Sequence, residues 1–346
     1  MVDNQKYVQM NENEFDLRDL FLALWSKKLV ILCITLIAAI LSGVISKFIL
    51  TPVYHSKLNI VINMPEKYNT KYGDYTLPIT TNEQYINLIT SNDILANTIV
   101  DMGYDPAATT IESIRDRIAI DMPETKEKTE QNSFKVRVSA DNPTEAQRLA
   151  MTLFDNYKEF LDVMTVEGAM DFYNSKYKIE LAAQNDSLIM MKELLAKNEE
   201  LLESTPQTIN QKDAMQEIED TANTTEYIIL ENVINPNYTK LEKDIIENKQ
   251  SIINIENLMR VYNNYLAEID MKKSSIADYK KTRNYDELKS EIVSVSNTNV
   301  YLPSDPIVPS RKASPSNTRN VAIGTIMGAM IGALVVLIKV YWFKSK

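Results

Sequence analysis

Two long apolar runs near the ends of the chain constrain its fold more than any other feature. They cover residues 29–46 and 321–338, and neither contains a charged side chain. Each is close to the ~20 residues that a helix needs to cross the hydrocarbon core of a bilayer. We therefore expect two transmembrane helices, over residues 29–50 and 321–338.

A cleaved signal peptide or a pair of buried helices would fit these runs less well. A signal peptide would account only for the first run, which starts late, is too long for an h-region and lacks a small-x-small cleavage site. A soluble protein with two buried helices would account for both runs and is the other alternative. We keep the interpretation of two spanning helices.

Lysines next to the two runs predict their orientation. They precede the first run and follow the second, at Lys27, Lys28, Lys339, Lys344 and Lys346. Positive residues stay on the cytoplasmic side of a membrane. Both tails, residues 1–28 and 339–346, are therefore expected in the cytoplasm, and residues 51–320 outside it.

Composition argues against several classes of function. The chain has 37 basic and 47 acidic residues, and this balance disfavours binding to nucleic acid phosphates. The single Cys33 excludes a disulfide framework, and the single His55 makes a histidine metal site or a catalytic triad improbable. The chain has no phosphate-binding loop and no GxSxG motif. We expect no catalytic residue, metal or cofactor, and no enzyme.

The segment after the first run is expected to form a mixed α/β base domain over residues 51–142. Pro52 ends the first helix, and residues 54–64 and 133–140 have the composition or alternation of strands. Two short helices are predicted within residues 81–103, where Gly103 stops the second, and another within 106–118. Before the first run, residues 15–25 have the spacing of an amphipathic helix.

A long helical rod is predicted over residues 143–300. Asn142 is the expected N-cap, Pro143 the first helical residue, and Glu145 the partner in a capping box. The helix would continue to Ser204, about 90 Å if unbroken, with Gly168 as a point of bending. Leucines repeat every seven residues along it, at Leu181, Leu188, Leu195 and Leu202.

A second helix of the rod is predicted after Pro236. Two heptad series define its apolar seam, with Asn248 as a polar position: Ile245, Ile252, Met259 and Leu266; Ile255, Tyr262, Ile269 and Ile276. We expect the two helices to pack as an antiparallel coiled coil. The tip would lie near residues 205–236, where the apolar segment 225–234 forms either a contact surface or local packing. The predicted fold class is α+β, with two transmembrane helices bracketing the base domain and the rod.

The chain returns to the membrane through residues 301–320, which are rich in proline and therefore extended. The second run then contains three of the seven glycines, Gly324, Gly328 and Gly332, on one helix face. In lipid, small residues decide which helices pack closely. The partner is either the small face of the first run or a neighbouring subunit. That face comprises Ala38, Ala39, Ser42, Gly43 and Ser46.

These features together resemble the chain length determinant (Wzz-type) family of polysaccharide co-polymerases. The region around Pro52 and Tyr54 is similar to the family's N-terminal region. The family pattern Pro-x2-Pro-x4-Ser-Pro-Lys-x11-Gly-x3-Gly is matched at the other end, except that Ser316 replaces the lysine. The matching residues are Pro306, Pro309, Ser314, Pro315, Gly328 and Gly332.

The resemblance implies a non-enzymatic homo-oligomer in the bacterial plasma membrane. Such proteins act with a membrane polymerase on a lipid-linked glycan, and they set the chain length of O-antigen, capsule or exopolysaccharide. A separate cytoplasmic tyrosine kinase is a further implied partner, with Tyr341, Trp342 and Phe343 as its docking residues. Alternatives are a two-span sensor, for which the short tail offers no output domain, and an exporter adaptor, which normally has one span and a lipoyl-like domain.

Overall fold

The computed structural model describes residues 17–121, 132–210 and 232–341, and the chain is mostly helical. It divides into two compact units. The first comprises residues 1–62, 82–157 and 301–346, and the second comprises residues 63–81 and 158–300.

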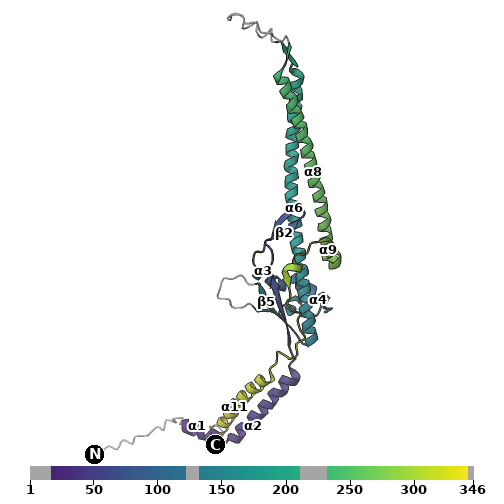
Figure 1. The fold of residues 1–346 in the computed structure, drawn as a ribbon. Helices are drawn as coiled ribbons and strands as arrows, with labels where there is room; N and C mark the ends of the chain where they lie inside the picture. Colours follow the sequence, from purple (N-terminus) through teal and green to yellow (C-terminus); the bar gives the residue numbers. More distant parts are fainter. Residues whose placement is uncertain (1–16, 122–131, 211–231, 342–346) are drawn as a thin grey trace, which may run out of the picture. The chain divides into compact units, whose positions relative to one another are not determined.

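The first unit contains the two long apolar helices. α2 (Lys28–Val44) follows α1 (Leu17–Ser26) and continues as a π-helical turn, η1 (Ile45–Ile49). α11 (Asn317–Tyr341) lies beside α2 (Figure 1). Both helices are long and apolar enough to cross a membrane. α11 starts before the predicted span because Ser316 caps it: the backbone N–H of Arg319 donates to the Ser316 hydroxyl at 3.4 Å.

A four-stranded sheet in the order β4-β5-β1-β8 forms the centre of the base domain. Its strands are β1 (Tyr54–Ile62), β4 (Ile118–Asp121), β5 (Ser133–Ala140) and β8 (Val300–Tyr301). The strands expected from the sequence are confirmed as β1 and β5, which pair antiparallel. β4 and β8 were not predicted, because strands of four and two residues are too short to show an alternation of apolar and polar side chains. One sheet face is buried, through side chains such as Leu58, Ile60 and Val136.

Short helices contribute to the core of the first unit, together with buried side chains of residues 143–157. The short helices are α3 (Asn82–Asn87), η2 (Leu88–Thr90), α4 (Asn92–Asp101) and α5 (Ile111–Arg115). Gly103 ends α4 in a left-handed conformation, with φ +71°, as its position predicted. The expected helix over residues 106–118 was wrong in extent, because Asp105 Oδ1 accepts the N–H of Ala107 in a turn and Thr110 then caps α5.

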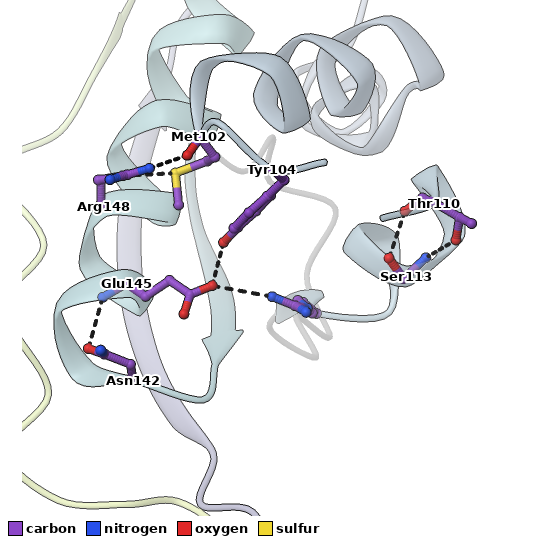
Figure 2. A network of polar contacts seen from close by, with 8 residues as sticks. Met102, Tyr104, Thr110, Ser113, Asn142, Glu145 and Arg148 are labelled. Atoms are coloured by element: carbon purple, nitrogen blue, oxygen red, sulfur yellow. Dashed lines mark hydrogen bonds and ion pairs between the residues drawn. The ribbon is translucent and has the colours of Figure 1, made fainter. Parts of the chain in front are cut away.

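α6 (Pro143–Ser204) begins and ends where the sequence predicted. Asn142 Oδ1 accepts the N–H groups of Thr144 and Glu145, at 2.9 and 3.3 Å. The capping box was wrong, because the Glu145 carboxylate turns away from Asn142 toward Tyr104 (Figure 2). The same carboxylate forms an ion pair with Arg117 at 3.6 Å. The Tyr104 hydroxyl donates to Glu145 Oε1 at 2.5 Å. Burial of the Tyr104 ring raises its pKa most, and the hydrogen bond to the Glu145 carboxylate raises the pKa further.

In the second unit, residues 158–204 of α6 lie beside α8 (Pro236–Thr282), as Figure 1 shows. Four ion pairs connect them in opposite chain order: Glu167–Lys280, Asp171–Lys273, Lys192–Glu256 and Glu199–Lys249. The helices are therefore antiparallel. The predicted seam residues Ile245, Ile252, Ile269 and Ile276 of α8 are buried. Beyond these helices, β6 (Thr208–Asn210) pairs with β7 (Asn232–Ile234), and residues 225–231 of the predicted contact segment lie outside the described residues.

A hairpin that the sequence did not predict packs on these two helices. β2 (Lys67–Thr70) and β3 (Gly73–Thr76) bring Tyr72 and Tyr75 into a cluster of rings with centroids 5.1–6.2 Å apart. The other rings are Phe172, Tyr173, Tyr177, Tyr262 and Tyr265. Gly168 was predicted to bend the rod, but α6 is one helix there. A Cβ at Gly168 would lie only 2.7 Å from the Tyr75 hydroxyl, so the glycine admits this ring.

The chain after α8 returns along α6. Arg283, with φ 60°, ends α8, and α9 (Tyr285–Glu291) and α10 (Ser296–Asn299) follow. Both are held by Asp162, which is only 1% exposed. Its carboxylate accepts hydrogen bonds from the Tyr285 and Ser294 hydroxyls and from the backbone N–H and hydroxyl of Ser296.

Candidate functional site

The three glycines of α11 form the contact face toward α2. A Cβ added to Gly324 would lie 2.4 Å from Ser42 Cβ, and one added to Gly328 would lie 2.6 Å from Ala38 Cβ. At Gly332 the nearest atom would be Ile31 Cα, at 3.2 Å. Real Cβ atoms do not approach other atoms as closely as at the first two positions, so the observed helix separation depends on glycine there.

The partner face on α2 is the small-residue face identified in the sequence. Ala38 and Ser42 lie against the glycines, and Gly43 faces Val321, whose Cγ2 would be 3.3 Å from an added Cβ. Large residues of both helices, such as Leu36 and Ile326, are exposed on the outer faces. The structure thus places the glycines against the chain's own first apolar helix, where small residues let the two backbones approach closely.

Polar side chains join the ends of the two helices nearest the base domain. The Ser42 hydroxyl donates to the Asn320 carbonyl at 2.6 Å, and Asn320 Nδ2 donates to the Ser46 hydroxyl at 2.9 Å. Ser46, 1% exposed, in turn donates to Asn317 Oδ1 at 3.0 Å. Lys312 Nζ donates to the same Asn317 oxygen at 2.9 Å. This chain of hydrogen bonds fixes the register of α11 on α2.

Replacing Ser46 with alanine is expected to lower the free energy of unfolding of the helix pair by about 1–2 kcal/mol, because two interhelical hydrogen bonds are lost and each typically contributes about 0.6–1 kcal/mol. Asn320 Nδ2 loses its acceptor, while the helix backbone is unchanged. The measurement is the thermal unfolding midpoint of the full chain in detergent. Ser26→Ala is the matched control, because the exposed Ser26 hydroxyl bonds only to the Ala23 carbonyl within α1. Equal midpoints for the two variants would contradict a role for Ser46 in the register.

The proline-rich return segment is tied to the exit of the first apolar helix. Val53 and Ser314 form an isolated bridge, in which the Val53 N–H donates to the Ser314 carbonyl at 2.8 Å. The Ala313 N–H donates to the Val53 carbonyl at 2.7 Å. Pro52 and Tyr54 flank this bridge on one segment, and Pro315 is buried next to it on the other. The bridge joins the N-terminal and C-terminal parts of the sequence pattern in space.

The remaining residues of the pattern are placed separately. Pro306 is buried, and its carbonyl accepts from Gln147 Nε2 of α6 at 2.8 Å, while Pro309 is half-buried. Ser316, at the position of the family's lysine, is the N-cap of α11. Lys312, four residues earlier, supplies an ammonium group to this end of α11. Trp342 and Phe343 lie outside the described residues, and only the backbone of Tyr341 is described.

The arrangement at these helix ends is one of close helix packing and interhelical hydrogen bonds. Within residues 17–121, 132–210 and 232–341, no group of three or more histidine, cysteine or carboxylate side chains has the geometry to hold a metal. A groove of about 460 Å³ opens between the ends of α2 and α11, lined mostly by apolar side chains together with Ser42, Ser46 and Asn320.

Residues 13–102 match the family model of the chain length determinant protein, Wzz. The resemblance to this family is confirmed. A curated relative, the capsular polysaccharide biosynthesis protein CpsC of Streptococcus pneumoniae, is 28% identical over 148 residues. The match covers 42% of this chain and 61% of the length of CpsC.

Solved structures similar to this chain include a full-length bacterial polysaccharide co-polymerase and a chain-length regulator. The co-polymerase is 15% identical with a TM-score of 0.42, over 93% of this chain and 96% of that one. The lipopolysaccharide O-antigen chain-length regulator WzzBSF of Shigella flexneri is 12% identical with a TM-score of 0.31. That match covers 75% of this chain and 99% of the regulator.

Proposed function

We propose that this protein is a non-enzymatic membrane scaffold that regulates the chain length of a surface polysaccharide. The observation that carries the proposal is the bridge between Val53 and Ser314. It joins the region that matches the Wzz model to the proline segment, and the proline segment leads directly into the glycine-packed α11. The bridge therefore brings Pro52 and Tyr54 close to Ser314 and Pro315, just before α11 begins.

In this proposal, α2 and α11 span the bacterial plasma membrane and both termini lie in the cytoplasm. The lysines beside the helix ends next to the two termini, Lys27, Lys28 and Lys339, support this orientation. The sheet and the α6/α8 pair then face outward. The short C-terminal tail, including Tyr341, Trp342 and Phe343, is the proposed docking segment for a separate cytoplasmic tyrosine kinase.

Copies of the chain are proposed to associate through their outward-facing parts and to act with a membrane polymerase on a lipid-linked glycan. The scaffold would bias the point at which polymerisation stops, by holding the polymerase or the growing chain. In this role the protein supplies geometry rather than catalysis. A two-span sensor would instead change a cytoplasmic output without altering the glycan.

Deleting the gene is expected to broaden or shift the length distribution of the surface polysaccharide while polymer is still made. The measurement is the ladder of extracted glycan on a gel, with the wild-type gene returned on a plasmid as the control. An unchanged ladder would contradict the proposed function. Complete loss of polymer would point instead to an essential role in polymerisation or export.

A further inference from the structure

The solvent-facing side of the sheet is basic although the chain as a whole is acidic. Lys57 of β1 lies directly opposite Arg137 of β5, and Lys135 follows on the same face. The remaining polar side chains of this face are His55, Asn59, Ser133, Ser139 and Asp121. Only Asp121 is acidic among them, and it pairs with Arg137 at 2.6 Å.

This arrangement leaves more positive than negative charge on the exposed face of the sheet. Like charges directly opposite each other on neighbouring strands repel, and the effect is a few tenths of a kcal/mol up to about 1 kcal/mol. Asp121 offsets part of this charge, because it pairs with Arg137 and lies directly opposite Lys135 on β4. Among the described residues, Lys57 has no ion-pair partner. An external anion would be complementary to the positive charge that Asp121 leaves on this face.

His55 lies within the same positive field. Burial lowers its pKa most, and the charges of Arg137 and then Lys57 lower it further. Its Nδ1 is 3.0 Å from the Ser139 hydroxyl, which fixes the ring on the sheet face. The neutral imidazole is therefore favoured in the fold, and an anion bound nearby would shift the balance toward the protonated form. Since His55 is the only histidine, it is a built-in reporter of this surface.

The basic character continues to the exit of the apolar helices. Residues 27–65 and 306–346 contain no aspartate or glutamate, whereas Arg311, Lys312 and Arg319 are exposed just before and at the start of α11. The Val53–Ser314 bridge joins this segment to the start of β1, and His55 follows Ile49 by a chain path of at most about 20 Å. Positive residues next to a span usually lie on its cytoplasmic side. The basic residues named here lie at the opposite end of the span in the proposed topology, and so depart from that distribution.

We propose that this face of the sheet and the adjoining helix exit bind the phosphate headgroups of anionic lipids in the outer leaflet. Lysine and arginine side chains near a membrane surface gain about 1 kcal/mol each from anionic lipid. The headgroups would relieve the repulsion between Lys57 and Arg137, and they would anchor the sheet to the bilayer. The inference rests on the proposed membrane topology, and it names a ligand that the proposed function does not.

The test uses the full chain, labelled with ¹³C-histidine and purified in neutral detergent through a tag without histidine. Short-chain phosphatidylglycerol is added, and the pKa of His55 is followed by NMR. We expect a saturable rise in the pKa, with no rise on adding phosphatidylcholine of the same chain length. Lys57→Gln/Lys135→Gln should weaken the apparent affinity at least fivefold. Lys197→Gln/Lys240→Gln, which removes the same charge from exposed positions on α6 and α8, should leave it unchanged.

Each other result overturns the proposal. An absent or non-saturable shift, or an equal shift with phosphatidylcholine, would show that the face does not select anionic headgroups. An equal shift with inorganic phosphate would assign the face to a soluble anion rather than to lipid. The Lys57→Gln/Lys135→Gln variant is expected to fold, because removing Lys57 also removes its repulsion with Arg137. The thermal unfolding midpoint of the variant checks this. The glycan ladder tests the proposed function independently, since a chain-length defect on gene deletion does not require lipid binding.

Discussion

Gly328→Leu is expected to force α11 away from α2 and to alter the glycan length distribution while the base domain and the α6/α8 pair stay folded. The first carbon of a side chain at this position would already lie 2.6 Å from Ala38 Cβ and 3.0 Å from Thr35 Cα. The second contact is with backbone, which cannot move without displacing the helix. Overpacking of this kind typically costs about 1–3 kcal/mol, and the three further carbons of leucine place the cost at the upper end.

The helix separation can be measured through the natural Cys33, which is exposed on α2. A spin label there and a second at Ile331→Cys, on the exposed side of α11, report the distance between the helices. We expect Gly328→Leu to lengthen the mean distance and to broaden its distribution. The same variant expressed in cells should produce a shifted or broadened glycan ladder.

Ala322→Leu is the matched control, because Ala322 lies on the exposed side of the same helix. It adds the same kind of bulk without meeting α2, so both the distance and the ladder should stay as in the wild type. Gly328→Ala should give a smaller displacement. If Gly328→Leu left the distance and the ladder unchanged, the three glycines would be a run of small residues without a packing role.

The sequence identified the elements whose pattern is local. Heptads and capping residues predicted both long helices of the second unit, and Pro143 and Ser204 are the observed ends of α6. The alternation over residues 133–140 predicted β5 to the residue. In each case the side chains that define the element are neighbours along the chain, so a periodic pattern carries the information.

The partner of the glycine face could not be chosen from sequence. Its own first helix and a neighbouring copy offer the same chemistry, since any small face permits close packing in lipid. The hairpin β2–β3 and the role of Gly168 were missed for a related reason. Tyr75 and Gly168 lie almost a hundred residues apart, and only the fold shows that the glycine makes room for the ring.

Asp162 is the clearest residue whose importance depends on distant partners. Its position on α6 resembles that of any other acidic residue on a long helix, and acidic residues of such helices are usually solvated. In the structure it is almost fully buried and accepts four hydrogen bonds of 2.7–3.0 Å from residues more than 120 positions away. It therefore connects α9 and α10 to α6.

Replacing Asp162 with alanine is expected to release residues 285–299 from α6. The backbone N–H and hydroxyl of Ser296, a residue with 0% exposure, lose their acceptor, and an unsatisfied buried polar group costs about 1–3 kcal/mol. With the Tyr285 and Ser294 bonds also lost, we expect local stability to fall by at least about 3 kcal/mol. Amide hydrogen exchange over residues 285–299 should then accelerate more than 100-fold.

Two further variants separate this local effect from general loss of charge on α6. Asp171→Ala removes an exposed carboxylate that pairs with Lys273, and such surface pairs contribute little, so exchange over residues 285–299 should not change. Asp162→Asn keeps the shape but places an amide where a carboxylate oxygen accepts, so its effect should be intermediate. Exchange along the seam of α8, at residues 245–269, is expected to stay slow in all three variants. If Asp162→Ala accelerated exchange at the seam as much as at residues 285–299, Asp162 would support the whole helix pair rather than the returning segment alone.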